Sequence, residues 1–493
     1  MSRTRNITVF VLAMFFLPGL ANALDFRTVD FQTARLFKEQ KWDSVVFLGK
    51  EALHDDIDYF YLRQRMGISY FHLGRYFPAI EHLEKAMKFN SSDLLTREYL
   101  YLSYAAAGRE DKARAVSPSI NKETRQRLKI RYSVFDQIDA EGGAIFSSEN
   151  KIQQNPFLMG KDSIAGEKDV YRNSYYAHLG VNLNIGSKIS VYVCYNYMDF
   201  LKVKYFQNAE PGNALVKIAD SAWGKQYIYS HSKVANDTSF QYHMTQHEAY
   251  LSVSVVLPKG FRIRPAFHFL NVSYNNINVH HSQQTIQDTA RFLRNPPRYL
   301  FIPFVKITDS YSQSDTSFSN YLGSLAIDWD IKIFRLTLSG SISNLNARTQ
   351  TQGGLSLTYF PLGSARFYGT SAATAFFEGG KSRLIFQQTL GGEVLKRLWI
   401  EGSLIYGDLS NANLSNGYLV YNITDTFNYG AGATLSYYFS KHWGISFTYQ
   451  FFSKESTTTY MLPNPEGPGR PVPATTISNY YTNTLIGGIK WKF

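Results

Sequence analysis

Residues 484–493 read TLIGGIKWKF, and their spacing is the clearest structural signal in the chain. Apolar residues and glycine alternate here with polar residues, except at Ile486 and Gly488. Leu485, Ile489 and Trp491 share one side of the stretch with Phe493, and the two lysines share the other. Because successive side chains of a strand point to opposite faces, the spacing predicts a β-strand with one apolar face.

The same alternation with a period of two recurs upstream, at 179–184, 189–197, 251–257, 334–342 and 443–451. Six short turns separate these segments at every second connection: Ile185-Gly186-Ser187, Pro258-Lys259-Gly260, Asp330-Ile331-Lys332, Pro361-Leu362-Gly363, Leu395-Lys396-Arg397 and Ser440-Lys441-His442. The other connections are long and polar, as at 206–235, 276–312 and 454–476. Short turns at one end and long loops at the other are typical of a transmembrane β-barrel.

The turns also predict the number of strands. Six turns pair twelve strands, and one further strand is needed near 131–147 and another at 478–493, which gives about fourteen, an even number. The stretch Asn413 to Ile423 is then an extracellular loop, whereas counting it as two strands gives sixteen. A fourteen-stranded barrel is too wide to be filled by its own side chains, so we expect a channel or a plug.

Polar residues of the alternating segments are predicted to face the lumen. The candidates are Arg262, Arg264, Asp328, Arg335, Arg366, Glu401 and Lys490, together with His178 and His268. Their excess of cations favours anionic cargo or sugars with acidic groups. Any water-filled barrel needs a polar lining, so this pattern alone leaves the cargo open.

In residues 26–127 similar residue types recur at an interval of 34 positions instead of two. Leu36, Tyr70 and Tyr104 fall in register, and so do Gln40, Gly74 and Gly108. The middle copy carries Gly67, Tyr70, Gly74, Tyr76, Ala79, Leu83 and Ala86. This order resembles the tetratricopeptide repeat, which implies three helix–turn–helix units. Such units hold a peptide or partner protein, or act as a spacer.

The first residues have the features of a signal peptide. Arg3 and Arg5 precede an apolar run from Ile7 to Leu17, and the small-residue site Ala21-Asn22-Ala23 follows. The alternative is a membrane anchor, for which the run is short. The predicted division is therefore a signal peptide at 1–23, a helical repeat domain at 24–128 and a β-barrel at 129–493, an α + β multidomain fold.

Motifs of catalysis are missing from the sequence. It contains no GxSxG, HExxH or CxxC, and its one cysteine rules out a disulfide framework and a Cys-based zinc site. We predict no catalytic, cofactor-binding or metal-binding residues and no enzymatic activity. The net charge of +12 comes from dispersed Lys and Arg, which does not favour nucleic acid as a partner.

The order of segments resembles the surface lipoprotein assembly modifiers (Slam proteins) and the exopolysaccharide export porins. The strand that carries Ile489, Trp491 and Phe493 is similar to the assembly signal of bacterial outer-membrane barrels. The resemblance implies a Gram-negative outer-membrane channel or translocation protein, whose periplasmic repeats recruit a protein or peptide. It also implies contact with the lipid bilayer and the outer-membrane assembly machinery. The alternative is a non-transporting anchor with a plugged barrel that presents the repeats to periplasmic partners.

Overall fold

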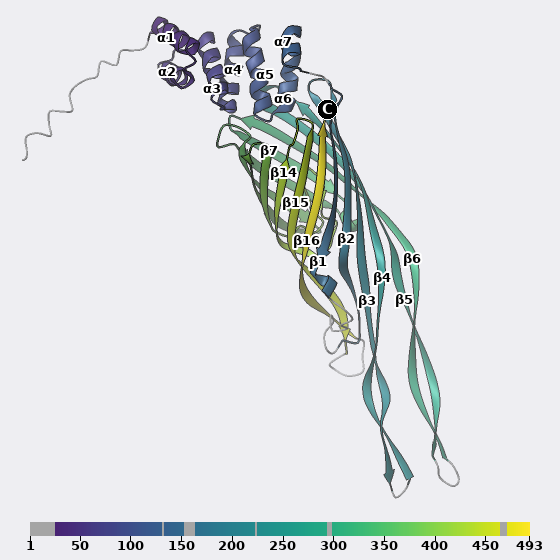
Figure 1. Cartoon of the computed structure of the whole chain (residues 1–493). Helices are drawn as coiled ribbons and strands as arrows, with labels where there is room; N and C mark the ends of the chain where they lie inside the picture. Colours follow the sequence, from purple (N-terminus) through teal and green to yellow (C-terminus); the bar gives the residue numbers. More distant parts are fainter. Residues whose placement is uncertain (1–24, 131–132, 152–162, 222–223, 293–297, 464–470) are drawn as a thin grey trace, which may run out of the picture. The chain divides into compact units, whose positions relative to one another are not determined.

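A computed structural model of the chain describes residues 25–130, 133–151, 163–221, 224–292, 298–463 and 471–493 (Figure 1). The chain divides between Leu128 and Lys129 into two compact units. One is helical and the other is a β-barrel, which confirms the predicted fold class. The predicted signal peptide at 1–23 lies outside the described residues.

Three helical hairpins and a last short helix make up the helical unit. The helices are α1 (Phe26–Lys38), α2 (Trp42–His54), α3 (Phe60–His72), α4 (Tyr76–Phe89), α5 (Leu94–Ala106), α6 (Glu110–Val116) and α7 (Lys122–Arg127). Gln40, Gly74 and Gly108 stand at the three hairpin turns with φ of 57°, 72° and 71°. This left-handed conformation favours glycine, so the 34-residue register marks the turns correctly.

Glycine at position 67 lets α3 approach α4 closely. A Cβ atom there would lie 2.6 Å from Leu83 Cγ, well inside contact distance. The other buried members of the middle repeat are Tyr70, Ala79, Leu83 and Ala86. Tyr76 is half-buried and its ring centroid lies 5.6 Å from that of Phe71.

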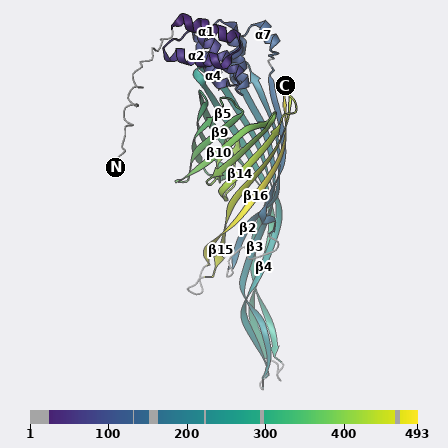
Figure 2. The same cartoon turned by 60° about the vertical axis from the view of Figure 1, so that its left-hand side comes forward.

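The second unit is a closed antiparallel barrel of 14 strands (Figure 2). The strands are β1 (Phe135–Ser147), β2 (Ala165–Ile185), β3 (Ile189–Ser221), β4 (Gly224–Val256), β5 (Phe261–Phe292), β6 (Arg298–Ile331), β7 (Phe334–Ser343), β8 (Gln350–Tyr359), β9 (Phe367–Glu378), β10 (Lys381–Leu395), β11 (Leu398–Tyr406), β14 (Thr426–Tyr437), β15 (Trp443–Leu462) and β16 (Val472–Lys492). Strand β16 pairs with β1 and closes the ring. The alternative of sixteen strands is wrong, because β12 (Asn413–Leu414) and β13 (Leu419–Val420) pair only with each other.

All six predicted short turns connect neighbouring strands at one end of the barrel, here called the short-turn end. Five of the six turns contain a residue with positive φ, as at Gly186, Lys259 and Lys332. The opposite end, which carries the other connections, is called the long-loop end. Strand β1 begins at the short-turn end, because its Phe135 pairs with Leu183 beside the first of these turns.

All three predicted long loops differ from the expectation. Most of 206–235 and 276–312 is strand, because β3 and β4 pair as far as Ser221 and Gly224, and β5 and β6 as far as Phe292 and Arg298. Figure 1 shows these two hairpins running past the rest of the barrel wall. The β15–β16 hairpin also extends, to the pair Leu462 and Val472. A hairpin pairs its own backbone groups and needs no buried face, so its sequence need not alternate.

The outer surface of the barrel is apolar and its interior is polar. Large apolar side chains remain exposed on the wall, among them Leu179, Leu251, Leu338, Leu404 and Phe447. Polar side chains are buried inside it, among them His178, Glu248, His268, Asp328 and Gln352. This inversion of the soluble pattern is the one a lipid-embedded barrel requires. As for the helices, none in the described part of the chain has the length and hydropathy to cross a membrane.

Candidate functional site

The candidate site is the lumen together with residues 407–425, here called the inner loop. This loop joins β11 to β14 at the long-loop end and carries the small sheet β12–β13. The sequence predicted an extracellular loop for Asn413 to Ile423. That prediction is wrong, because these residues contact inward-facing side chains of strands all around the barrel.

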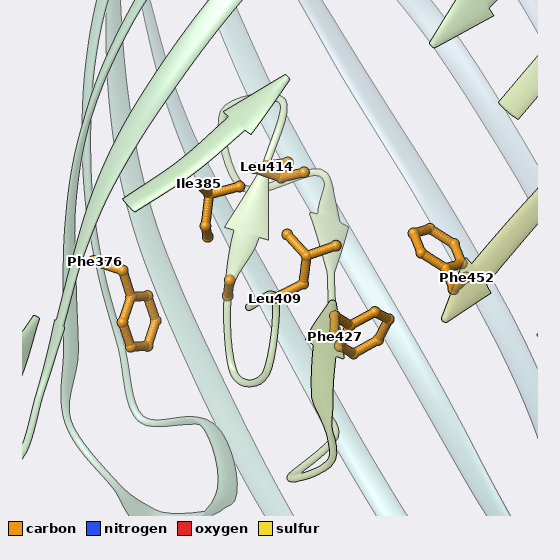
Figure 3. Packing of buried hydrophobic residues seen from close by; sticks show 7 residues of the cluster. Phe376, Ile385, Leu409, Leu414, Phe427 and Phe452 are labelled. Atoms are coloured by element: carbon orange, nitrogen blue, oxygen red, sulfur yellow. The ribbon is translucent and has the colours of Figure 1, made fainter. Parts of the chain in front are cut away.

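The start of the inner loop is fixed by an apolar cluster on the wall of β9, β10, β14 and β15. Leu409 and Leu414 of the loop pack there with four wall residues: Phe376, Ile385, Phe427 and Phe452 (Figure 3). Arg383 on β10 donates from Nε to the Asp408 carbonyl at 2.9 Å. Its guanidinium also lies 3.6 Å from the centroid of the Phe376 ring. Leu409 is almost fully buried, so the loop folds inward to cover its apolar side chains.

The tip of the inner loop contacts the opposite wall. The Gly417 carbonyl accepts a hydrogen bond from His268 Nδ1 on β5 at 2.8 Å. The Asn416 carbonyl accepts from Ser324 Oγ at 2.8 Å and from the Tyr250 hydroxyl at 3.2 Å. In the order of the ring, β5 stands seven places from β14 among the 14 strands, directly across. The inner loop therefore crosses the lumen.

Amide side chains hold the loop between its base and its tip. Gln352 on β8 pairs twice with the Asn413 backbone, accepting from its N–H at 3.0 Å and donating to its carbonyl at 2.8 Å. Asn422 donates from Nδ2 to Gln246 and Asn320, at 3.3 Å each. Backbone groups in a wide lumen need partners, and the wall supplies them.

A buried chain of charged and polar side chains lies behind the loop tip. His268 Nε2 lies 3.3 Å from Glu248 Oε2, and the other side of that carboxylate accepts from Gln246 Nε2 at 2.6 Å. Both nitrogens of His268 thus face acceptor oxygens, the Glu248 carboxylate and the Gly417 carbonyl. The Nδ1 atom donates to the Gly417 carbonyl, whereas Nε2 faces the Glu248 carboxylate without a hydrogen bond of its own.

His178 on β2 has a similar arrangement. Its Nε2 lies 2.8 Å from Asp139 Oδ2 and its Nδ1 lies 2.6 Å from Asn196 Oδ1. The orientation of that amide is fixed, because Asn196 Nδ2 donates to Glu248 Oε2 at 2.7 Å. Two histidine–carboxylate contacts are therefore linked across β1 to β5. The ring of Tyr418 covers them from the loop, with its centroid 6.2 Å from that of His178.

Two cavities lie on either side of the inner loop. The short-turn cavity, of about 500 Å³, is lined by wall residues near the short turns and by 413–416 of the loop. The long-loop cavity, of about 510 Å³, is lined by the opposite parts of the strands and by 422–424. The loop therefore divides one polar lumen into two chambers.

Most of the predicted lumen residues line the short-turn cavity: Arg262, Arg264, Asp328, Arg335 and Glu401. Arg262 Nε and Arg264 Nη2 each lie 2.9 Å from the Asp328 carboxylate, and Arg335 Nε lies 2.8 Å from Asp330. Glu401 accepts a hydrogen bond from the Tyr368 hydroxyl. These ion pairs offset the cation excess that the sequence suggested, so the cavity is polar rather than strongly positive.

Of the other two predicted lumen residues, Arg366 lies outside the lumen and Lys490 faces it without lining either cavity. Arg366 sits in the turn before β9, where its side chain is 66% exposed and pairs with Glu393 at 3.6 Å. It does not line either cavity. Lys490 stands opposite Asp139 in the pairing of β16 with β1, on the face that points away from lipid. Sequence reasoning missed Glu248, although the inward alternation of Ser252 and Ser254 extends to it.

The residues of the predicted assembly signal lie on the outer surface at the seam of the ring. The Trp491 ring stacks on Trp443 with centroids 5.2 Å apart, and its centroid lies 4.9 Å from that of Phe493. The Phe493 centroid lies 5.7 Å from that of Phe135 on β1. Ile489 is exposed on the same face. In the described residues, no three His, Cys, Asp or Glu side chains group as a metal site would.

Comparisons with known proteins give distant likenesses. No family model matches the chain, and none of the curated proteins matches it. A Pseudomonas aeruginosa FadL homologue has 8% identity and a TM-score of 0.39, over 79% of this chain and 94% of that one. The P. putida toluene transporter TodX has 8% identity and a TM-score of 0.35, over 76% of this chain and 92% of that one. A mutant of MamA has 23% identity and a TM-score of 0.19, over 20% of this chain and 73% of that one. These scores are too low for the activities of those proteins to bear on this chain.

Proposed function

We propose that the protein is an outer-membrane channel whose passage is controlled by the inner loop. The observation that carries this proposal is the lumen itself, a polar passage with a cavity of about 500 Å³ on each side of one crossing loop. A barrel that served only as an anchor has no need of a polar chamber at both ends. Removing one loop from the lumen would join the two chambers into a pore.

The helical unit is proposed to recruit cargo or partner machinery in the periplasm. Strand β1 begins at the short-turn end, and short turns face the periplasm in barrels of this class. An aromatic row crosses the helical hairpins: the Trp42 ring stacks on His72 with centroids 4.4 Å apart, and the Tyr99 hydroxyl lies 3.3 Å from His72 Nε2. Half-exposed aromatic rings of this kind are favourable contacts for a bound peptide.

A non-transporting anchor is the second candidate, and the contacts of the inner loop favour it. The loop is fixed at its base by Leu409, in its middle by Asn413 and at its tip by Gly417. A loop held this firmly could act as a permanent plug. The two functions differ in one measurable respect, which is whether the loop leaves the lumen.

A disulfide between the loop and the wall tests the proposal. A Cβ added at Gly417 would lie 3.5 Å from Ser324 Cβ, a separation that a disulfide spans. The variant is Ser324→Cys with Gly417→Cys in a Cys194→Ser background, because Cys194 is the one native cysteine. The control is the pair of single variants, Ser324→Cys and Gly417→Cys, each in the Cys194→Ser background. Both are needed because Gly417 has a φ of +79° and its added Cβ would lie 2.5 Å from Leu322 Cδ2, which strains the loop tip without any disulfide.

Conductance in planar bilayers is the measurement. We expect the oxidised double variant to stay closed and the same protein, once reduced, to conduct as the control does. A second variant, with 409–423 replaced by a short glycine–serine linker, is expected to conduct continuously. If neither the reduced variant nor the shortened loop conducts, the barrel is a plugged anchor and the channel proposal is wrong.

A further inference from the structure

The long-loop cavity carries a row of aromatic side chains that the proposed channel function does not explain. The row consists of Tyr171 on β2, Tyr242 on β4, Tyr274 on β5 and Phe318 on β6, and β3 lies between the first two. The centroids of Tyr242 and Tyr274 lie 6.2 Å apart, and those of Tyr274 and Phe318 lie 6.4 Å apart. A simple aqueous passage has no use for apolar rings in its wall, because they face water there.

One lysine interrupts this row. Lys202 on β3 stands opposite Tyr171 and Tyr242 in the strand pairing, and its Nζ lies 4.1 Å from the centroid of the Tyr171 ring. The residue is only 8% exposed. Among the described residues it makes no direct ion pair, whereas the neighbouring Lys204 pairs with Glu167 at 3.0 Å. Asp169 lines the same cavity and accepts from the Tyr242 hydroxyl at 3.0 Å, and Asp425 interacts with Lys202 electrostatically, but neither carboxylate contacts the ammonium directly. A buried cation without a carboxylate in direct contact is costly, so Lys202 favours an incoming anionic group.

Amide side chains surround the aromatic row and complete the chemistry. The cavity is also lined by Gln246, Asn276, Asn320, Asn344, Asn346 and Asn422. Each amide has both donors and an acceptor, which is the complement of a vicinal hydroxyl pair. Most of their donors already bond within the protein, as those of Gln246 and Asn422 do, but the Asn422 Oδ1 atom is buried without a hydrogen-bond partner. A sugar hydroxyl can donate to that acceptor, whereas an ionised fatty acid or aromatic acid has no donor to offer.

We propose that the long-loop cavity binds an acidic saccharide, with its sugar rings packed on the aromatic row and its carboxylate paired with Lys202. The apolar faces of a pyranose ring match the faces of Tyr and Phe rings, and its hydroxyls match the amides. This inference deepens the proposed function by naming its substrate class. It concerns equilibrium binding, so it is measured without any conductance.

Isothermal titration calorimetry of the full chain in detergent tests the proposal with two matched probes. The probes are β-1,4-linked trimannuronate and β-1,4-linked mannotriose, which differ in having a carboxylate or a hydroxymethyl group on each ring. We expect trimannuronate to bind about tenfold more tightly, as one charge-assisted contact provides. Benzoate, an anion without hydroxyls, should bind more weakly than trimannuronate.

Variants assign the roles of the residues. Lys202→Met should abolish the preference for trimannuronate, and Lys202→Arg should retain it. Tyr274→Leu should weaken the binding of both sugars. Lys188→Met and Tyr321→Leu are the controls, since both residues are exposed outside the cavity, and they should change neither affinity. Heat-modifiable migration on gels verifies that each variant has folded.

Three results would overturn the proposal: no heat of binding with either sugar, equal affinities of the wild type and Lys202→Met, or tighter binding of benzoate than of trimannuronate. The proposed channel can fail separately. A barrel that never conducts but still prefers trimannuronate would have the binding site without the passage.

Discussion

His268 and Gly417 join opposite walls of the lumen through one hydrogen bond, from the imidazole Nδ1 to the backbone carbonyl over 2.8 Å. His268 comes from β5, whereas Gly417 is the tip of a loop that leaves the wall at β11 and returns at β14. The imidazole is fully buried, and its other nitrogen faces Glu248. Because the Gly417 carbonyl is buried, this hydrogen bond supplies the partner that it would otherwise lack, and it fixes the loop across the lumen.

Substitution of His268 should therefore release the inner loop. Leaving the buried Gly417 carbonyl without its donor costs about 1–3 kcal/mol, which shifts the docking equilibrium about fivefold to a hundredfold. We expect His268→Ala to expose the loop to chymotrypsin, which cleaves after the packed Tyr418. The rate of that single cut, followed by mass spectrometry, should rise at least about fivefold, because cleavage follows the population of the open form.

A histidine on the outer surface provides the matched control for this experiment. His247 is exposed and pairs with the Tyr195 hydroxyl at 2.6 Å, away from the loop. His247→Ala should leave the cut after Tyr418 at the wild-type rate. Equal rates in all three proteins would mean that the His268 contact does not hold the loop.

Packing in the helical unit gives a prediction at Gly67. Because an added Cβ would lie 2.6 Å from Leu83 Cγ and 2.8 Å from its Cδ2, Gly67→Ala overpacks the α3–α4 contact. Overpacking costs about 1–3 kcal/mol, offset by about 1 kcal/mol of helix propensity. Thermal unfolding followed by circular dichroism at 222 nm should therefore show a lower midpoint for the helical transition.

The double variant separates overpacking from other effects. In a Leu83→Ala background the clashing atoms are gone, so adding Gly67→Ala should be neutral or stabilising. Gly74→Ala is the control, since no atom lies within 4 Å of its added Cβ and its φ is +72°. Its cost is backbone strain of about 1–2 kcal/mol, which Leu83→Ala should not alter. Equal effects of Gly67→Ala in both backgrounds would exclude the steric explanation.

The helical unit should also lose stability in weak acid because of His82. Burial, with Arg63 as a second cause, lowers the pKa of His82 to about 4. Its Nδ1 lies 3.2 Å from Arg63 Nη1 and must accept that hydrogen bond, which requires the neutral ring. The unfolded chain binds a proton near pH 6.5, whereas the folded one does so near 4. The free energy of unfolding therefore falls as the pH is lowered from about 6.5 to about 4, by about 3 kcal/mol in total.

Chemical unfolding at a series of pH values between about 4 and 7.5 measures this slope. His82→Gln should remove most of it, leaving the smaller contribution of His72, whose pKa burial also lowers. Asp58 does not interfere, because its hydrogen bond with Arg63 lowers its pKa and confines its effect to more acidic solutions. A wild-type stability that is constant over this range would contradict the prediction.

The barrel wall was predictable because each strand has a lipid face and a water face. That requirement imposes alternation, and turns such as Ile185-Gly186-Ser187 interrupt it at every second connection. The helical hairpins were predictable for a similar reason, since the left-handed residues Gly74 and Gly108 recur at a fixed interval. In both units the pattern is set by local geometry repeated along the chain.

The inner loop was not predictable, because its contacts are made with distant strands. Asn413 bonds to Gln352, and Gly417 bonds to His268, 149 residues away. A short polar segment with three leucines has the same composition on the outside of a barrel as within it. The extended hairpin of β3 and β4 was missed for another reason: paired strands in water bury neither face, so no alternation marks them.

The seam between β16 and β1 gives the last prediction. Phe493 contacts Trp491 on its own strand and Phe135 across the seam, and its N–H donates to the Asp136 carbonyl at 3.1 Å. Aromatic contacts of this kind contribute about 0.5–1.5 kcal/mol beyond the burial of their area. Phe493→Ala should therefore slow closure of the ring, seen as a longer half-time for the heat-modifiable folded form in pulse–chase labelling.

A control and a second measurement distinguish seam stability from recognition by assembly machinery. Phe367→Ala removes a similarly exposed ring near the short-turn end but away from the seam, and it should assemble at the wild-type rate. Refolding of purified Phe493→Ala into detergent separates the two causes. A defect in both settings places the effect in the seam contacts, whereas a defect in cells alone places it in recognition of the strand. Normal assembly of Phe493→Ala in cells would exclude both, and the terminal strand would then carry no assembly signal.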